Sequence, residues 1–549
     1  MKVTIRNKTY IREIKYYEEL YQNHLDNICM YMKENGLEFS VEKTNLIFFS
    51  NCQLPKKLPK LTLSGKILNY VEEVKFLGVI FNRKLCWKSH INYLCQKALK
   101  SLNLLRFISS KPWGQDASIL IHLATALVRS RLTYGQEAFF AAPKTYLNKL
   151  RSIDSKAYKI ALGVPVHTKT EEVYKLVGIL SLDDQRKLSC AKYLIRANAI
   201  TETDQETLKI KSDENFPKRS QNIQKFTTIA TYVGDVLEQN ELSNNIVKKN
   251  TPSPIPPWEL QKAKFFYEYC DVTKQENPIK LSVIAKELLY TKYQSFLHIY
   301  TDGSVSESNE AGAGFIIPKL NISKSIYLGK DYSVYTAELT AIQMALNSIV
   351  ELNRSIISIV FCVDSKSVIQ AIENNKQNER NDIITEIKIT VHNLIINGTH
   401  VEFFWIPSHC NIKNNDKADQ LAKQGSKNIN SIQVFLKKSV KEMASLVDKK
   451  MKMNLNKSKF DLRQKIGPRK ETSLAFRLML NSWRIKYCKD IKCICKKEIT
   501  LYHLIIECQK MKQHLPTNYK NVTNLKELEF KNWLEIAEYF IKSALDINL

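Results

Sequence analysis

The sequence lacks the features that would assign it to a membrane or to the secretory route. No apolar run approaches the length of a transmembrane helix. The segment from Met1 to Leu20 is charged throughout and has no apolar core, so we identify no signal peptide. The 12 cysteines are mostly isolated, a usage that suits a reducing compartment rather than a disulfide framework. We therefore expect an intracellular protein, in the nucleus or the cytoplasm, that contacts no membrane.

Negative charge is scarce relative to positive charge. The chain has 55 Asp and Glu against 82 Lys and Arg, a formal net charge of +27. A surplus of this size predicts a polyanionic partner, because each neutralised phosphate releases counterions. The alternative explanation of the positive charge is that the protein comes from a generally lysine-rich proteome. With 549 residues, of which 44% are hydrophobic and 25% charged, we expect several globular domains rather than a disordered chain.

Two acidic residues stand where a globular core would not place a charge. The stretch 298–304 is a short apolar and β-branched run that stops at Asp302, Gly303 and Ser304. This pattern predicts a strand whose last residue projects a carboxylate where the chain turns. Glu338 lies three and four residues before Ala341 and Ile342, so it shares their inward helical face.

Two more acids follow in the same order of elements. Asp364 ends the nearly continuous apolar run 356–363, which is typical of a strand covered on both faces. Asp419 lies in a predicted helix that opens after the strand 401–407. Each acid alone is explained by a helix cap or a surface charge. The ordered set of strand Asp, helix Glu, strand Asp and helix Asp argues for one shared site.

A divalent cation would remove the cost of gathering these four acids. Buried carboxylates without partners are unfavourable, and like charges held close raise each other's pKa. Oxygen ligands without Cys or His suit Mg²⁺, or Mn²⁺, rather than Zn²⁺. Four carboxylates can hold two such ions roughly 3.5–4 Å apart, an arrangement used in phosphodiester cleavage.

The motifs around these acids resemble a type 1 ribonuclease H domain. They are Tyr-Thr-Asp-Gly-Ser at 300–304, Tyr-Thr-Ala-Glu-Leu at 335–339, Val-Asp-Ser at 363–365, Trp-Ile-Pro-Ser-His at 405–409 and Asn-Asp-Lys-Ala-Asp-Gln-Leu-Ala at 415–422. The variant is similar to that of non-LTR, jockey-like retrotransposon polyproteins. The resemblance implies a five-stranded mixed sheet with flanking helices within an α/β multidomain protein.

The same resemblance implies roles for individual residues. Asp302, Glu338, Asp364 and Asp419 would bind the metal ions, and His409 corresponds to the histidine of a mobile loop. Hydrolysis of the RNA strand of an RNA–DNA hybrid would leave 5′-phosphate and 3′-hydroxyl ends. Choice of the RNA strand would depend on contacts with 2′-hydroxyl groups, for which the residues flanking the acids are candidates: Gly303, Ser304, Tyr335 and Thr336.

Two features inside this region bear on packing and affinity. Gly312 and Gly314 lie in the second predicted strand, 311–317, and lack the helix and lysine of a phosphate loop. We interpret them as positions where a neighbouring element approaches closely. Only residues 374–381 separate the helix after Asp364 from the next helix, which leaves no room for the extra basic helix found in some members of the family. Substrate affinity is then expected to depend on other parts of the chain.

The first 200 residues resemble the end of a non-LTR reverse transcriptase, with Asn-Gly-Leu, Lys-Thr-Asn and Phe-Leu-Gly-Val motifs before a helical block. The Tyr/Phe-X-Asp-Asp hairpin of such polymerases is missing, and the one Asp-Asp pair, Asp183-Asp184, has polar, helical surroundings. We expect a remnant without polymerase activity, to which a separate polymerase could be a partner. The predicted organisation is 1–80 palm end, 81–200 helical thumb, 201–257 linker, 258–295 helical approach, 296–426 ribonuclease H domain and 427–549 basic helical tail.

The tail contains a second cluster of metal-binding residue types. Three thiols and one imidazole, Cys493, Cys495, His503 and Cys508, can build a Cys₃His zinc site, and Cys488 could replace one of the first two. The resemblance supports such a knuckle, although one residue, not the common two, separates the first pair. Incidental thiols in a helical tail are the alternative.

The function predicted from the sequence is hydrolysis of RNA–DNA hybrids. One alternative is an inactive nucleic-acid-binding remnant of a mobile element, which a missing acid would favour. The other is a different nuclease on the same fold, such as an exonuclease or an integrase. The Thr-Asp-Gly-Ser opening and the loop with His409 argue against that second alternative.

Overall fold

The computed structural model describes residues 10–50, 58–110, 114–199, 229–234, 254–266, 278–374, 379–408, 411–428, 430–453, 468–482, 495, 497, 500–512, 515–520, 522–525 and 528–542. Two compact units make up the chain. One combines residues 1–186 with 454–549, and the other spans 187–453. Each unit has a hydrophobic core of its own. The predicted linker falls mostly outside the described residues.

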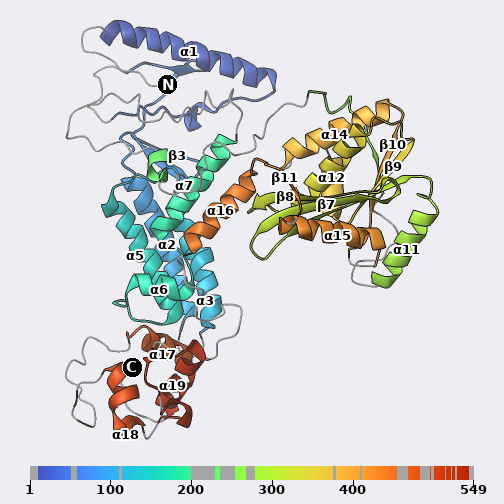
Figure 1. The fold of residues 1–549 in the computed structure, drawn as a ribbon. Coiled ribbons are helices and arrows are strands. Elements are labelled where there is room, and N and C mark those ends of the chain that lie inside the picture. Colours follow the sequence, from blue (N-terminus) through green and yellow to red (C-terminus); the bar gives the residue numbers. More distant parts are fainter. Residues whose placement is uncertain are drawn as a thin grey trace. The chain divides into compact units, whose positions relative to one another are not determined.

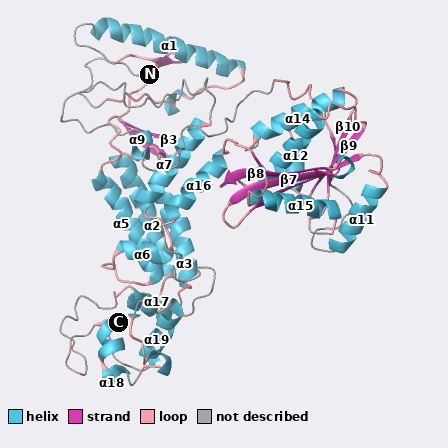
Figure 2. Cartoon of the chain, viewed as in Figure 1, coloured by secondary structure: helices cyan, strands magenta, loops and turns pink. Residues whose placement is uncertain are grey.

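The unit 187–453 is built on one mixed sheet (Figures 1 and 2). Its strand order is β11-β8-β7-β6-β9-β10-β5, so the predicted five-stranded mixed sheet is confirmed, with a short strand added at each edge. The bounds are β5 Lys264–Phe266, β6 Leu297–Val305, β7 Glu310–Ile317, β8 Ile322–Lys330, β9 Ser358–Val363, β10 His400–Trp405 and β11 Ile432–Gln433.

Strands β6, β7 and β8 form an antiparallel meander, whereas β6, β9, β10 and β5 run parallel. The prediction that the first strand ends at Asp302 is wrong. Strand β6 continues to Val305, with Asp302 paired to Gly314 and Gly303 paired to Ala313. The turn comes later, where Asn309 N–H donates to Ser306 O. The glycine at position 303 serves close packing against a helix, not a turn.

Helices cover both faces of this sheet. In Figure 1, α12 (Val334–Glu351) and α14 (Asn381–Ile396) lie on one face and α15 (Lys413–Ser426) lies on the other. The remaining helices of the unit include α11 (Pro278–Tyr290), α13 (Lys366–Glu373) and α16 (Val440–Lys452). The apolar positions of α12, β9 and β10 fill the core between these layers.

Helix α15 lies close to strand β7 at two positions where the strand has glycine. A Cβ added to Gly312 would lie 2.0 Å from Ser426 N, and one added to Gly314 would lie 2.4 Å from Ala422 N. Both distances are shorter than any real Cβ contact, so only glycine allows this helix to lie so close. The predicted close approach at these two glycines is confirmed. It brings α15, with Asp419, against the strand that pairs with Asp302.

The unit containing residues 1–186 begins with α1 and small β elements and continues as a helical block. Helix α2 buries Ile91, Leu94, Ala98, Leu102 and Leu105, which recur at the helical spacing. The described α-helices and strands up to residue 198 are α1 Tyr10–Glu34, β1 Thr62–Leu63, β2 Lys66–Ile67, β3 Glu73–Phe76, β4 Val79–Asn82, α2 Lys88–Ile108, α3 Ala117–Leu123, α4 Ser130–Leu132, α5 Lys144–Leu162, α6 Thr170–Val177 and α7 Leu182–Asn198, the last of which crosses the boundary between the units.

The C-terminal segment packs into this helical block. Arg477 Nε donates to Gly163 O at 2.8 Å, and an Arg469 nitrogen donates to Ile160 O at 2.6 Å, so the tail caps the end of α5. Helices α17 (Arg469–Met479) and α19 (Phe530–Lys542) add apolar residues to the same core, and α18 (Gln509–Lys512) is a short helix between them. The tail therefore shares the first unit's core, a relationship that the sequence did not indicate.

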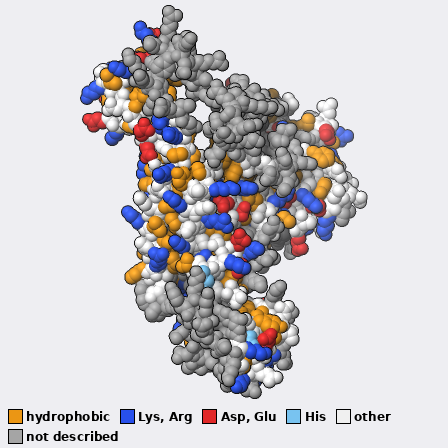
Figure 3. Space-filling view, turned by 90° about the vertical axis from the view of Figure 1, so that its left-hand side faces the viewer, with side chains coloured by type: hydrophobic (Ala, Val, Ile, Leu, Met, Phe, Trp, Pro, Cys, Tyr) orange, Lys and Arg blue, Asp and Glu red, His pale blue; other side chains and the backbone are white. Residues whose placement is uncertain are grey.

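Basic side chains recur over the described surface. Figure 3 shows Lys and Arg distributed over the face in view and interleaved with hydrophobic side chains, rather than gathered in one block. Among the described residues, no helix combines the length and the apolar character that crossing a membrane requires.

Candidate active site

The register of two parallel strands places Asp302 beside Asp364. Strands β6 and β9 pair Thr301 with Val363, so the residues that follow each of them occupy neighbouring positions. The chain after β9 is fixed by Trp405, whose indole N–H donates to the backbone oxygen of Asp364 at 2.9 Å. Carboxyl ends of parallel strands meet at one edge of a sheet, which explains why distant parts of the sequence bring two acids together there.

Glu338 reaches the same edge from the first turns of α12. The helix is capped by Ser333, whose hydroxyl accepts from Thr336 N–H at 3.2 Å. A Cβ at Gly303 would lie 2.4 Å from Glu338 N, so the helix can occupy this position only because residue 303 has no side chain. Packing of α12 on β6 thus sets the position of Glu338.

The three carboxylates converge in the interior. One oxygen from each of Asp302, Glu338 and Asp364 lies within 4.8 Å of the others. Asp302 is 7% exposed and Glu338 is 5% exposed. The Oε2 atom of Glu338 is buried without a hydrogen-bond partner. Three acids therefore share a small volume, and one oxygen of Glu338 lacks a donor there.

The electrostatics of the cluster follow from this crowding. Burial, then repulsion from Asp364 and Asp419, raises the pKa of Asp302 to about 8. Burial also raises the pKa of Glu338 well above its ordinary value, with Asp364 and Asp302 adding to the effect. The backbone N–H of Gly303 lowers both pKa values, but it does not offset the other causes. Without a cation Asp302 keeps its proton near neutral pH.

Asp419 borders the cluster from α15, on the opposite face from α12. It acts on the pKa of Asp302 both through charge and through a side-chain hydrogen bond, which places the two carboxyl groups in contact. Lys423, one turn later on the helix, forms an ion pair with Asp419 at 2.7 Å. The fourth acid is therefore more exposed than Asp302 and Glu338, and it already has a cationic partner.

These residues fit a divalent metal ion. The donor set consists of oxygens alone, which Mg²⁺ and Mn²⁺ prefer. The unpartnered Glu338 Oε2 and the raised pKa values of two acids are the marks of a site that lacks positive charge. A bound cation would supply that charge.

The residues predicted to contact substrate differ in their placement. Ser304 and Tyr335 are half-buried, and Tyr335 lies one turn before Glu338 on α12. Thr336 has no exposed surface, and its hydroxyl donates to Glu442 at 2.6 Å. A direct substrate contact does not fit this position of Thr336, because its hydroxyl is engaged in the interior. Gly303 fits by its backbone alone, and His409 lies outside the described residues.

Comparison with known proteins identifies this part of the chain. Residues 294–427 match the sequence model of the RNase H family, a range that contains all four acids. This segment is an RNase H domain.

The relatives of the chain are retrotransposon proteins. It is 22% identical over 177 residues to an RNA-directed DNA polymerase from the mobile element jockey of Drosophila melanogaster, a match covering 32% of this chain and 19% of that protein. It is 28% identical over 101 residues to a Pol polyprotein of the type-1 retrotransposable element R1 of Bradysia coprophila, covering 18% of this chain and 10% of that protein. The chain thus spans about a fifth or less of the length of these relatives in its matched part. It is related to jockey-like retrotransposon polyproteins.

One solved structure to which this chain is similar is that of RNase H1 from the archaeon Halobacterium salinarum. The match covers 24% of this chain and 98% of that one, with 17% identity and a TM-score of 0.20.

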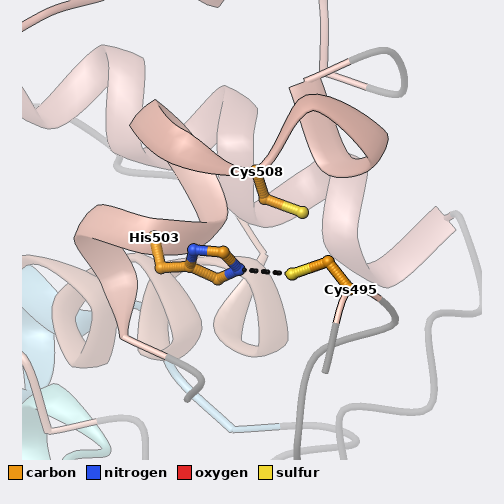
Figure 4. A group of neighbouring side chains, drawn as sticks. All are labelled: Cys495, His503 and Cys508. Carbon is orange, nitrogen blue, oxygen red and sulfur yellow. Dashed lines mark hydrogen bonds between the residues drawn. The ribbon is translucent and has the colours of Figure 1, made fainter. Parts of the chain in front are cut away.

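A second cluster lies outside the RNase H domain, in the C-terminal segment. Figure 4 shows the thiols of Cys495 and Cys508 facing the ring of His503, and one ligand atom from each lies within 4.8 Å of the others. The Sγ atom of Cys495 is 3.0 Å from His503 Nε2. On the other side of the ring, Glu507 Oε2 is 3.2 Å from His503 Nδ1 and fixes the ring's orientation. Cys493 and Cys488 lie outside the described residues.

Two residues of the RNase H unit were missed by reasoning from the sequence. Lys423 lies four residues after Asp419, and its spacing on a helix could have indicated an ion pair. Glu442 lies beyond residue 427, and its side chain accepts hydrogen bonds from Ser333 and Thr336 at the start of α12. The sequence signal for Glu442 was its capping box with Ser439, which predicts a helix start but not the partner helix.

Proposed function

We propose that this protein hydrolyses the RNA strand of RNA–DNA hybrids. The observation that carries the proposal is the convergence of Asp302, Glu338 and Asp364 within an RNase H domain, with one oxygen from each inside a 4.8 Å range. Asp419 completes the set through its contact with Asp302. The assignment as a type 1 ribonuclease H rests on the same motifs.

Asp302, Glu338, Asp364 and Asp419 would hold two Mg²⁺ ions, for which Mn²⁺ could substitute. Such ions, when bound, stabilise negative charge on a phosphate and make water a better nucleophile at neutral pH. The protein's part is to lose the proton from Asp302 and to keep the four carboxylates at one edge of the sheet. The tight packing of α12 and α15 at glycines provides that rigidity.

Residues around the acids would position the substrate. Ser304 and Tyr335 flank the cluster and are our candidates for contacts with 2′-hydroxyl groups, and the Gly303 N–H faces the carboxylates. His409 is proposed to assist proton transfer or product release from its loop. The expected products carry 5′-phosphate and 3′-hydroxyl ends.

An inactive nucleic-acid-binding remnant is the main alternative function. It would be favoured by loss of an acid or by an altered strand register, and all four acids are present with the register of β6 and β9 intact. Another nuclease on this fold is distinguished by its substrate. Cleavage of a DNA duplex with an equal rate would favour that alternative.

We also propose that the Asp183-Asp184 pair is not a polymerase site. Asp183 forms an ion pair with the buried Arg186 at 2.8 Å, and Asp184 Oδ2 accepts from Ser181 Oγ at 2.6 Å. Both side chains therefore have local roles at the start of α7. The function that we propose for this chain does not include DNA synthesis.

The C-terminal cluster is proposed to bind Zn²⁺ through Cys495, His503 and Cys508. Two thiols and one imidazole are the donors that zinc prefers, and Cys493 or Cys488 could supply a fourth ligand. The apolar residues around it, Leu504 and Ile505, belong to the core of the helical unit, which suggests a structural role.

A cleavage assay tests the main proposal. A hybrid with a labelled RNA strand, the same RNA alone, the RNA duplex and the DNA duplex are incubated with the full chain and Mg²⁺. We expect cleavage of the RNA in the hybrid alone, with 3′-hydroxyl ends that a polymerase can extend. Absence of cleavage in both Mg²⁺ and Mn²⁺ would overturn the proposal.

A further inference from the structure

A groove of about 750 Å³ opens on the unit 187–453, and two of its lining residues lie within three positions of acids of the cluster in the sequence. One wall is formed by the start of α12, a second by α13, and a third by α16. Most of the residues that line it have polar or charged side chains, and those that matter below are Tyr335, Ser367, Lys441, Glu442 and Lys449. Helix α16 lies outside the range that matches the RNase H family.

Two walls of the groove belong to helices that carry or directly follow an acid of the cluster. Tyr335 precedes Glu338 by three residues on α12, which is about 5 Å along a helix. Ser367 follows Asp364 by three residues in the first turn of α13. A nucleic-acid strand whose phosphate lies at the acids would therefore extend along this groove.

A buried carboxylate fixes α16 as the third wall. Glu442 is 6% exposed, and its Oε1 accepts from Ser333 N and from Ser333 Oγ, both at 2.8 Å, besides Thr336 Oγ1. Its Oε2 accepts from Ser439 N at 2.9 Å and lies 3.5 Å from Arg380 Nη1. These donors lower the pKa of Glu442 in spite of its burial. Helix α16 is thus attached to the first turn of the helix that carries Glu338.

Helix α16 turns a row of polar residues toward the groove. Lys441, Ser445 and Lys449 follow one another at intervals of four, so they lie along one helical face. The two lysines are separated by about 12 Å along the axis, whereas one strand of a duplex advances about 3.4 Å per phosphate. They can therefore contact different phosphates of the same strand.

Each lysine is paired with one acid across the groove. Lys449 Nζ lies 3.2 Å from Asp331 Oδ1, and Lys441 Nζ lies 3.7 Å from Glu379 Oε1. Both lysine side chains are at least half exposed, and ion pairs of this kind contribute little to stability. A phosphate can replace either carboxylate at small cost, whereas Glu442 is already compensated by Arg380 and its hydrogen bonds.

We propose that α16 binds the substrate of this nuclease, with Lys441 and Lys449 contacting backbone phosphates of the bound hybrid. The inference rests on the proposed function and extends it. From the sequence we expect substrate affinity to depend on parts of the chain outside the RNase H domain, because the segment between α13 and α14 is too short for a basic helix. Helix α16 would provide that affinity. The acids Asp331 and Glu379 act as competitors that a phosphate must displace.

Binding measured without cleavage tests this role. The full chain is titrated into a fluorescently labelled RNA–DNA hybrid in EDTA, at several salt concentrations, and the Kd is read from anisotropy. We expect Lys441→Gln with Lys449→Gln to weaken binding about tenfold and to lower the slope of log Kd against log salt by about two, one for each lost phosphate contact. The opposite change, Asp331→Asn with Glu379→Gln, is expected to tighten binding several-fold.

The control has the same change in charge. Lys280→Gln with Lys286→Gln alters two lysines of α11, an element that contributes nothing to the groove, and should leave the Kd and the slope within twofold of the wild type. Glu442→Gln should lower the salt slope as the double lysine variant does, although both lysines remain, because α16 loses its attachment. A lower melting temperature with an unchanged slope would show a merely structural role for Glu442.

The outcomes separate this inference from the proposed function. Unchanged Kd and slope in the Lys441 and Lys449 variant, with normal hybrid cleavage by the wild type, would refute substrate binding by α16 and still support the proposed nuclease activity. Loss of affinity in that variant, with no cleavage by the wild type in the presence of any metal ion, would support substrate binding by α16 and refute the proposed nuclease activity. An equal loss of affinity in the α11 control variant would refute specific binding by α16, because the effect would then depend only on the net charge of the protein.

Discussion

Gly303 lies against the backbone of Glu338, so closely that a Cβ at residue 303 would be 2.4 Å from the Glu338 nitrogen and 2.8 Å from the Ala337 carbonyl carbon. The contact joins the strand that carries one acid to the helix that carries another. Its consequence is that the spacing of Asp302 and Glu338 depends on the absence of a side chain between them. The glycine is a requirement of the site's geometry.

Gly303→Ala should therefore separate α12 from β6. Overpacking of a fitted contact costs about 1–3 kcal/mol, and here the obstacle is backbone, which cannot rotate away. We expect a melting temperature lower by several degrees and a loss of Mg²⁺ affinity, both measurable on the purified protein. Gly234→Ala is the control, because no atom lies within 4 Å of a Cβ built there. A variant at position 303 with wild-type melting and metal affinity would contradict this account.

Asp302→Asn should abolish hybrid cleavage and leave hybrid binding largely intact. The amide cannot provide the charge that the metal site needs, and metal ions supply several kcal/mol of transition-state stabilisation, or about 10²–10³-fold in rate. Cleavage and anisotropy are measured on the same preparation. Asp416→Asn, one turn before Asp419 on α15, is the matched control and should retain activity. Residual cleavage near the wild-type rate would remove Asp302 from the proposed ligand set.

The raised pKa of Asp302 predicts how the metal-free protein responds to pH. The folded state keeps a proton up to about pH 8, whereas the unfolded chain releases it near the ordinary value of 3.8. Between these values the folded state binds more protons, so its stability should fall as the pH rises. Melting in EDTA from about pH 5 to about pH 9 measures this, and Asp302→Asn should reduce the slope.

Metal binding should show the same linkage from the other side. Ligands must lose their protons, so Mg²⁺ affinity should rise toward pH 8 and binding at neutral pH should release about one proton per protein. Calorimetry in two buffers of different ionisation enthalpy counts these protons. Binding without proton release would mean that Asp302 is already ionised in the free protein.

The sequence could indicate the elements on which the acids lie because each position depends on local pattern and on sheet geometry, whereas their role as metal ligands stays a prediction. A strand pattern before Asp302 and an apolar run before Asp364 suffice, since parallel neighbours bring the ends of strands to one edge. The inward face of α12 followed from its periodicity. The strand end at Asp302 was predicted wrongly because a glycine after an acid is typical of a turn, and a glycine required by close packing has the same local signature.

The contacts of Glu442 could not be predicted in this way. It lies more than a hundred residues after Glu338 in the sequence, and a capping box reports only on its own helix. Nothing in the pattern of α16 shows that its first turn meets the first turn of α12. Thr336 illustrates the same gap, because its position near a predicted metal ligand suggested a substrate contact, whereas its hydroxyl donates a hydrogen bond to Glu442.

The last prediction concerns the C-terminal cluster. If Cys495, His503 and Cys508 bind zinc, the purified full chain should contain about one zinc ion per protein, and Cys508→Ser or His503→Ala should lose it. Binding should weaken as the pH falls, because thiols and imidazole must be deprotonated to act as ligands. Cys29→Ser, at a half-buried cysteine elsewhere in the same unit, is the control and should retain the metal.

Chelation of that zinc should destabilise the helical unit and spare the RNase H domain. Leu504, Ile505 and Cys508 belong to the core that also contains residues of α17, α19 and α2. Structural zinc contributes roughly 10–16 kcal/mol in small peptides, and here the shared core should retain part of the fold without it. Hydrogen exchange in reducing buffer, with and without a chelator, should rise in residues 500–512 and in α17 and α19 but not in β6, β9 or β10. Equal protection in both conditions, in a chain that carries no zinc, would return these thiols to an incidental role in the core.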